Sequence, residues 1–163
     1  MRERITKAKA YIAVKNYNAA IYELENIRRE TNEPTINSVV NVLLMSSYLE
    51  QSDYKRAQDF LKELAKSNKN GYTAVAGQVV KGARSQLERY KSLGLSVSDR
   101  NLPLEAAADV EKMRQTLELV IEQSKVLGKE KTQSSNAIAL LEEASNARSG
   151  LAKDDYDATR WKN

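Results

Sequence analysis

A near-repeat of one segment constrains the fold more than any other feature of the chain. Residues 16–27 read NYNAAIYELENI, and residues 53–64, thirty-seven positions later, read DYKRAQDFLKEL. Shifted by that interval, the chain superposes six pairs of identical or similar residues: Tyr11 and Tyr48, Asn16 and Asp53, Tyr17 and Tyr54, Ala20 and Ala57, Leu24 and Leu61, Ile27 and Leu64. A period in the thirties built from two short helices is typical of helical solenoids, in which repeats stack because one pair alone leaves apolar surface uncovered.

Apolar residues recur at helical spacing along the chain, and no segment alternates as a strand does. The spacing and the helix breakers predict eight helices, over residues 2–15, 17–31, 35–51, 54–67, 72–93, 103–127, 132–149 and 154–162. Asn16 suits an N-cap, Gly94 a helix stop, and Pro34 and Pro103 the first turn of a helix. The sequence therefore predicts an all-α fold of about eight helices whose third pair is elongated.

The repeated pattern resembles the tetratricopeptide repeat (TPR) family. That family has a small residue, an aromatic residue three positions later, a capped turn with Tyr, and then Ala. The first copy supplies Ala8, Tyr11, Asn16, Tyr17 and Ala20, and the second supplies Met45, Tyr48, Asp53, Tyr54 and Ala57. The chain departs from the family in lacking its Trp and in having Asn32 where a proline is expected. The resemblance implies a TPR-like right-handed α–α superhelix.

The same pattern predicts how the chain is organised. We expect a single TPR-like domain over residues 1–163. Its predicted parts are repeat one, repeat two, an elongated helix pair and a degenerate repeat or capping pair, over residues 1–33, 34–70, 71–129 and 130–163 respectively. The last part keeps only fragments of the pattern, namely Ala147, Asp155, Tyr156 and Thr159.

The composition argues against an enzyme. The chain has no cysteine, which excludes disulfides and thiol nucleophiles, and no histidine, the commonest general base and metal ligand. Glu142 and Glu143 are adjacent, so on a helix they point about 100° apart and cannot share a metal ion or a proton. We therefore expect no catalytic residues, no cofactor and no metal site.

The charge pattern and the hydropathy limit which partners and which cellular compartments are compatible with the chain. Net charge is +4. Its excess lies partly in residues 2–15, but acidic residues alternate with lysines elsewhere, which argues against nucleic acid as a partner. No apolar run reaches the roughly 20 residues that span a bilayer. We expect a soluble protein, cytoplasmic or, if a leader was removed, bacterial periplasmic; the compartment stays unknown.

The resemblance also implies a binding surface. In TPR proteins the first helix of each repeat lines a concave groove that holds a peptide. Carried over by position, the groove comprises Lys9, Ile12, Ala13, Asn41, Ser46, Leu49, Glu50 and Gln86. Of the family's Lys and Asn clamp for a C-terminal carboxylate, only Lys9 is present, and Ser46 replaces an asparagine.

Two asparagines on an otherwise apolar helix leave an alternative open. Asn37 and Asn41 lie one turn apart, and buried asparagines need hydrogen-bond partners. They either bond to neighbouring helices or contact the backbone of a bound peptide.

Taken together, these features predict a non-catalytic protein–protein interaction module, a scaffold or adaptor. The alternative is a self-association domain that forms a homodimer through the elongated hairpin. We interpret Trp161, the single tryptophan, as an anchor that closes the last hydrophobic layer.

Overall fold

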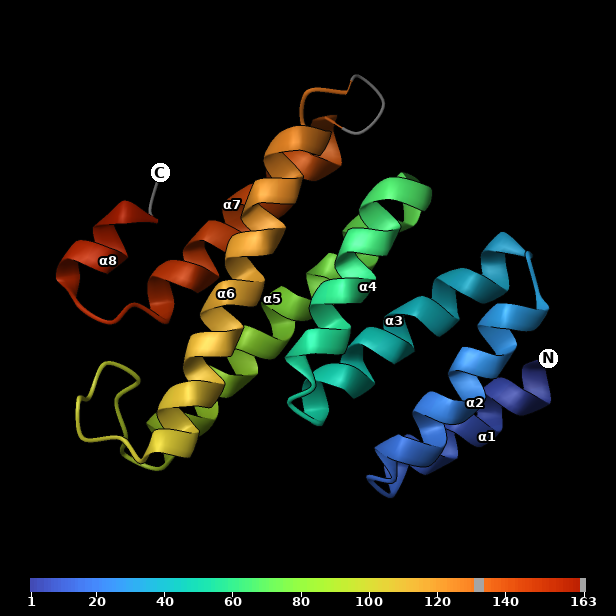
Figure 1. The fold of residues 1–163 in the computed structure, drawn as a ribbon, viewed down its shortest axis with the longest axis horizontal. Helices are drawn as coiled ribbons and strands as arrows, with labels where there is room; N and C mark the ends of the chain where they lie inside the picture. The colour runs from blue at the N-terminus through green and yellow to red at the C-terminus, as the bar shows by residue number, and fades with distance from the viewer. Residues whose placement is uncertain (131–133, 162–163) are drawn as a thin grey trace. The chain divides into compact units, whose positions relative to one another are not determined.

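The computed structural model describes residues 1–130 and 134–161, and this part of the chain contains eight α-helices and no strand (Figure 1). The helices are α1 (Arg2–Ala13), α2 (Tyr17–Glu30), α3 (Pro34–Glu50), α4 (Tyr54–Ser67), α5 (Lys69–Ser92), α6 (Leu104–Leu127), α7 (Ser134–Gly150) and α8 (Asp155–Arg160). The all-α prediction is confirmed. The elongated third pair corresponds to α5 and α6, which have 24 residues each.

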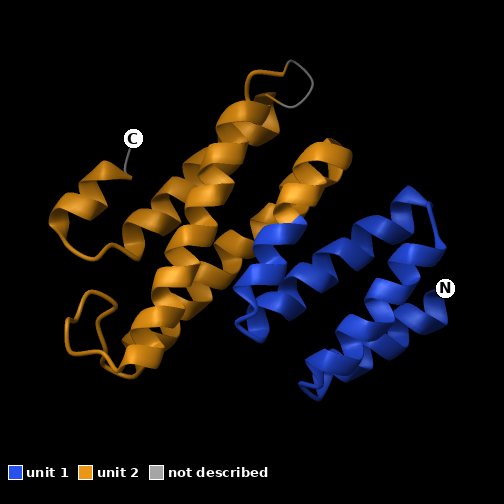
Figure 2. Cartoon of the chain, viewed as in Figure 1, with its two compact units in different colours: residues 1–60 blue, residues 61–163 orange. Residues whose placement is uncertain are grey.

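The chain divides into two compact units, Met1–Phe60 and Leu61–Asn163, called unit 1 and unit 2 below (Figure 2). The boundary falls within α4, inside the segment that the sequence predicts as repeat two. Each unit has its own set of helix packings.

In unit 1, helix α2 packs against both α1 and α3. Ala8 of α1 and Ala20 of α2 are fully buried, as are Leu24 and Ile27 of α2. Small side chains at buried positions let two helices approach closely, and the leucine and isoleucine fill the remaining space. Tyr48 is buried too, and its hydroxyl donates to Glu25 Oε2 at 2.8 Å. The alanines of the repeat pattern therefore serve helix packing.

The two helix–helix turns of the repeat have the same backbone geometry. Lys15 and Ser52 both have positive φ, 63° and 56°. In the first turn Asn16 N donates to Tyr11 O at 2.8 Å, and in the second Asp53 N donates to Tyr48 O at the same distance. In each turn the bond joins the N–H of one residue to the C=O five residues earlier, and the residue just before the donor is left-handed. This is the Schellman motif, which ends a helix.

Each turn also starts the next helix in the same way. The Asn16 side chain accepts from Ala19 N at 3.3 Å, and the Asp53 side chain accepts from Arg56 N at 3.2 Å. Such N-caps satisfy free N–H groups of the first turn. Tyr17 and Tyr54 are both the first residue of the capped helix. The repeat seen in the sequence is thus a repeat of turn geometry.

The C-terminal end of α5, in unit 2, repeats the turn that ends a helix but not the N-cap that begins the next one. Gly94 has φ 75°, and Leu95 N donates to Tyr90 O at 2.8 Å. A leucine here takes the place of Asn16 and Asp53, so the side chain that would cap a following helix is missing. An irregular segment therefore follows α5, and α6 begins only at Leu104.

We expect glycine at the left-handed position to stabilise the protein. Ser52→Gly should raise the free energy of unfolding by about 0.5–1 kcal/mol, because a residue with a Cβ is strained at positive φ and glycine is not. The measurement is urea unfolding followed by circular dichroism. The matched control is Gln51→Gly, at φ −88°, which should destabilise. Destabilisation by both variants would contradict the geometry of this turn.

In unit 2, helix α7 packs against both α5 and α6, α5 also contacts α6, and α8 contacts α7 (Figure 1). The core residues come from all three long helices and include Tyr72, Val79, Leu117, Val120, Leu140 and Ala144. The hydroxyl of Tyr72 on α5 donates to Gln123 Oε1 on α6 at 2.6 Å. The apolar stripes of the elongated pair are thus covered in part by α7.

Candidate partner-binding groove

The residues predicted to line a TPR-like groove do not share one environment. Seven of them lie in unit 1 and Gln86 lies in unit 2. Lys9, Ala13 and Glu50 are exposed, and Ile12, Ser46 and Leu49 are half-buried. Asn41 and Gln86 are buried. Six of the eight side chains are therefore accessible to a partner in this structure.

The two buried members bond to neighbouring helices. Asn41 Oδ1 accepts from Arg28 Nε on α2 at 2.9 Å, and the same guanidinium lies 4.8 Å from the ring centroid of Phe60. Asn37 Nδ2 donates to Thr31 O at 3.1 Å, just before α3. Of the two roles left open for these asparagines, the structure therefore shows the bonds within the protein. Gln86 Nε2 donates to Asp109 Oδ2 on α6 at 2.7 Å.

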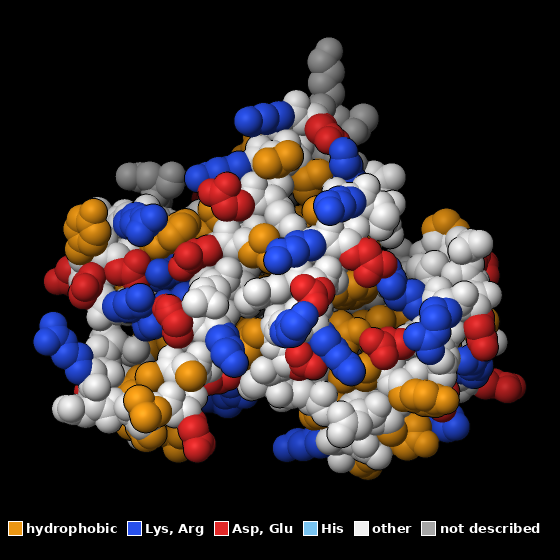
Figure 3. Space-filling model, in the orientation of Figure 1, with side chains coloured by type: hydrophobic (Ala, Val, Ile, Leu, Met, Phe, Trp, Pro, Cys, Tyr) orange, Lys and Arg blue, Asp and Glu red, His pale blue; other side chains and the backbone are white. Residues whose placement is uncertain are grey.

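The basic residues of α1 are partly neutralised by α2. Arg4 pairs with Glu30, and Lys7 Nζ lies 3.3 Å from Glu23 Oε1. Lysine, arginine and acidic side chains are interspersed over the face drawn in Figure 3. This distribution differs from the single-sign stripe that a phosphate backbone attracts.

A groove of about 450 Å³ lies between α6 and α7 in unit 2, and we call it the α6–α7 groove. Its lining residues are Ile121, Glu122, Lys125, Ile138, Leu141, Glu142, Ser145, Asn146, Arg160 and Trp161. Apolar side chains from α6 and α7 meet Trp161 there, and charged residues of both signs also line it. Ile138 is 56% exposed, so much of its side chain is accessible at the groove.

A second hollow of similar volume adjoins the first along α6. It shares Glu122 with the α6–α7 groove, and its other lining residues are Ala65, Lys66, Lys69, Gln123, Val126, Leu127 and Glu130. Val126 is 61% exposed, and an ion pair of 2.6 Å joins Lys69 Nζ to Glu130 Oε1. The C-terminal half of α6 therefore presents apolar side chains to two adjacent hollows.

A buried arginine holds α8 beside the groove. Arg148 of α7 is 3% exposed. Its Nη1 and Nη2 each donate to one carboxylate oxygen of Asp157 at 3.0 Å, and its Nε donates to Glu118 Oε2 at 2.9 Å. The same guanidinium lies 5.2 Å from the ring centroid of Trp161. This two-point arginine–carboxylate geometry is among the strongest polar interactions in proteins.

The contact with Arg148 lowers the pKa of the Asp157 carboxyl. Its burial by itself raises the pKa, but the bonds from Arg148 and from Lys153 N outweigh burial and hold the pKa of Asp157 below its ordinary value. The carboxylate is therefore charged at neutral pH and stays paired with the guanidinium.

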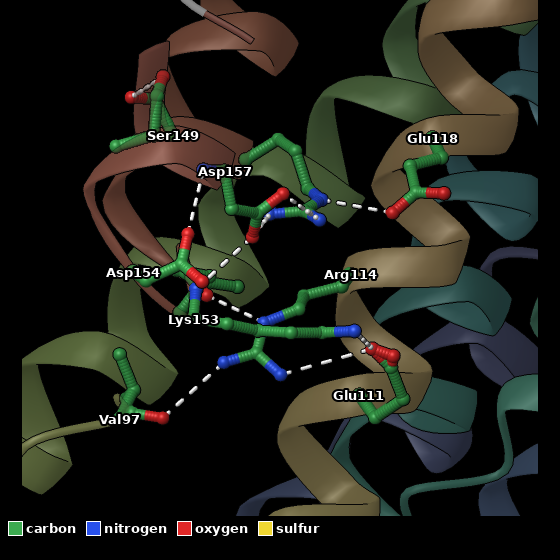
Figure 4. Close-up of polar contacts among 11 residues, drawn as sticks. Val97, Glu111, Arg114, Glu118, Ser149, Lys153, Asp154 and Asp157 are labelled. Carbon is green, nitrogen blue, oxygen red and sulfur yellow. Dashed lines mark hydrogen bonds and ion pairs between the residues drawn. The ribbon is translucent and has the colours of Figure 1, made fainter. Parts of the chain in front are cut away.

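A second buried arginine ties the irregular segment after α5 to the α7–α8 turn. Arg114 Nε donates to Leu151 O at 2.5 Å, and its Nη2 donates to Val97 O at 3.2 Å. Glu111 lies near both Arg114 and Lys153, with Nη1 at 3.7 Å and Nζ at 3.4 Å from its Oε1. Figure 4 shows these side chains converging from α6 and the C-terminal segment. The cluster positions α8 and hence the rim of the α6–α7 groove.

The sequence contains a signal for both buried arginines, Arg114 and Arg148. Arg114 lies four residues after the buried Val110, and Arg148 lies four residues after the buried Ala144. Both therefore stand on the apolar face of their helix, where a charge needs a partner. Sequence spacing finds such a residue but not its partner, because Asp157 reaches Arg148 only through the α7–α8 turn.

Within residues 1–130 and 134–161, no group of three acidic residues is placed to hold a metal ion. In the same part of the chain, no helix combines the length and the hydropathy that a membrane span needs.

No family model matches the chain, and neither a curated protein nor a solved structure shows significant similarity to it.

Proposed function

We propose that the protein is a non-catalytic interaction module, and that it binds a peptide or protein segment in the α6–α7 groove. The observation that carries the proposal is the groove itself, where exposed Ile138 adjoins Leu141 and Trp161 with polar residues around them. A groove between two helices with apolar walls suits an amphipathic segment that buries side chains spaced by one helical turn.

We further propose that the first four helices are TPR-like repeats. The support is the matched pair of turns at Lys15 and Ser52, each followed by a capped helix that begins with tyrosine. Under this proposal the accessible residues Lys9, Leu49 and Glu50 form a second candidate surface, on the first helices. Self-association through the α5–α6 hairpin is favoured less, because α7 packs against both of its helices.

A peptide-library selection tests the proposal and distinguishes the two surfaces. Peptides displayed on phage are selected on the immobilised full-length protein and then measured against variants by fluorescence anisotropy. We expect Ile138→Glu to weaken binding at least tenfold, since a charge at the groove wall must be desolvated when the peptide docks. Leu49→Glu on α3 and Val14→Glu in the α1–α2 turn should leave binding unchanged.

The other outcomes are equally informative. Loss of binding in Leu49→Glu alone would move the site to the first helices. Peptides that bind all three variants as tightly as the parent protein would place the partner surface elsewhere. Circular dichroism of each variant checks that the helices are intact, since these three side chains are half-buried or exposed.

A further inference from the structure

Helix α8 is held to the rest of unit 2 by polar contacts near the α6–α7 groove. It has six residues, and none of them is buried. Asp157 pairs with Arg148, and Ser149 Oγ donates to Ala158 O at 2.9 Å. Its last residue, Arg160, and the following Trp161 both line the groove. A short helix without buried side chains contributes little apolar stabilisation, and elements of this kind are generally the ones that open without unfolding of the core.

Two residues of this segment contact the same cation. Asp157 and Trp161 are four positions apart, so they lie on one face of the C-terminal segment. Asp157 accepts both Nη groups of Arg148, and the Trp161 ring lies 5.2 Å from the Arg148 Cζ. The acid and the aromatic residue together recognise one buried guanidinium.

Arg148 restricts what can take the place of α8. Glu118 accepts only from Nε, so the two Nη groups depend on Asp157. A guanidinium that is 3% exposed and loses a carboxylate leaves a buried charge without compensation. Any replacement must therefore supply a carboxylate to Arg148 and an aromatic ring in place of Trp161, beside the guanidinium.

We propose that α8 is the resident occupant of one end of the α6–α7 groove, and that it is displaced by a segment of a second protein with an acidic residue four positions before an aromatic residue. The proposal rests on the proposed function, because it names the partner chemistry of that same groove. The charge complementarity between Arg148 and the acid selects the partner, and the ring supplies the apolar contact. While α8 is bound, the groove is partly autoinhibited.

The probe is a fluorescein-labelled synthetic peptide with the sequence of residues 151–161, LAKDDYDATRW. It is titrated into the full-length wild type and into the full-length double variant Asp157→Ala/Trp161→Ala. We expect binding to the double variant to be at least tenfold tighter, because the tethered segment of the wild type competes at a high effective concentration. Peptides that carry Asp157→Ala or Trp161→Ala should bind the double variant at least tenfold more weakly.

A matched control uses the same helix. Tyr156 is 82% exposed, so a peptide with Tyr156→Ala should bind like the parent peptide. Equal affinity for the wild type and the double variant, or no binding to a double variant whose circular dichroism is intact, would overturn the proposal. A concentration-dependent dimer of the wild type that the double variant does not form, measured by light scattering, would also overturn it, because the occupant would then be a second copy of this chain.

A second measurement uses the wild type alone. Trp161 is the only tryptophan, so its fluorescence reports on α8 without interference. Excess unlabelled peptide with Trp161→Phe should raise acrylamide quenching of the protein at least twofold by releasing Trp161 into water. Unchanged quenching at saturation would reject displacement.

Different results would reject the interaction module and the displacement of α8. Library peptides that require Ile138 but do not compete with the α8 peptide would leave the interaction module standing without the displacement. Binding of the α8 peptide to the double variant, when the library yields no ligand, would show that α8 occupies a releasable site and would reject the broader function.

Discussion

Arg148→Ala is expected to lower the free energy of unfolding by roughly 3 kcal/mol, a large effect for one side chain near the end of the chain. The substitution leaves Asp157 without its two-point partner and opens space beside Trp161. Glu118 loses less, because more than a third of its side chain is exposed and can be hydrated. Urea unfolding at pH 7, followed by circular dichroism, measures the loss.

A second variant and a double-mutant cycle separate the effect of the charge from that of the arginine–carboxylate geometry. Arg148→Lys keeps the charge but cannot form the planar fork, so it should recover only part of the stability. A double-mutant cycle with Asp157→Ala should give a coupling energy above about 0.5 kcal/mol, the level at which contacting residues deviate from additivity. A coupling near zero would mean that the pair does not stabilise the native state.

The acid dependence of stability follows from the same pair. Since the pKa of Asp157 is depressed in the folded state, its contribution is full above the ordinary aspartate pKa and is lost as the pH falls through the folded-state pKa. The parent protein should therefore lose stability more steeply on acidification than Arg148→Ala does. If the free energy of unfolding fell equally steeply at low pH in the parent protein and in Arg148→Ala, the contribution of this pair would be contradicted.

Tyr72→Ala is expected to cost about 3–5 kcal/mol, the range for removing a fully buried aromatic side chain. Tyr72 is fully buried on α5, and burial holds the pKa of its hydroxyl well above the ordinary value. Deletion of the ring leaves a cavity that surrounding helices fill only in part. The measurement is again the shift in urea midpoint at pH 7.

Tyr72→Phe separates the ring from the hydroxyl. It removes the bond to Gln123 Oε1 but keeps the volume, so about 1 kcal/mol is the expected loss. A phenylalanine variant as unstable as the alanine variant would show that the hydrogen bond, rather than the packing of the ring, dominates at this position.

The helices themselves could be predicted closely from the sequence. Among the described residues, the predicted bounds differ from the observed ones by at most three residues, and α4 agrees at both ends. The predicted start at 132 and the predicted end at 162 lie outside the described residues. Local signals suffice here, because N-caps, proline and glycine act within one or two turns. The repeated turns at Asn16 and Asp53 were visible for the same reason, since the residues that form each turn are neighbours in the chain.

Two of the predicted binding residues, Asn41 and Gln86, show what a family position does not report. A family position assigns Asn41 and Gln86 to a groove, but burial and bonds to Arg28 and Asp109 hold both inside the protein. Whether a polar side chain faces a partner or a neighbouring helix depends on which helix packs beside it, and periodicity does not report that. For Trp161, the sequence indicates a packing role but not the residue that it contacts. Its packing role was expected, but its contact with Arg148 was not.

The sequence by itself determined the all-α class, the helix bounds and the repeated turn, because each depends on residues a few positions apart. Only the tertiary structure decided the α6–α7 groove and the Arg148 cluster, which join α6, α7 and the C-terminal segment. These contacts arise when the helices pack, since the geometry that brings Asp157 to a buried guanidinium is a property of the packed chain and of no single segment.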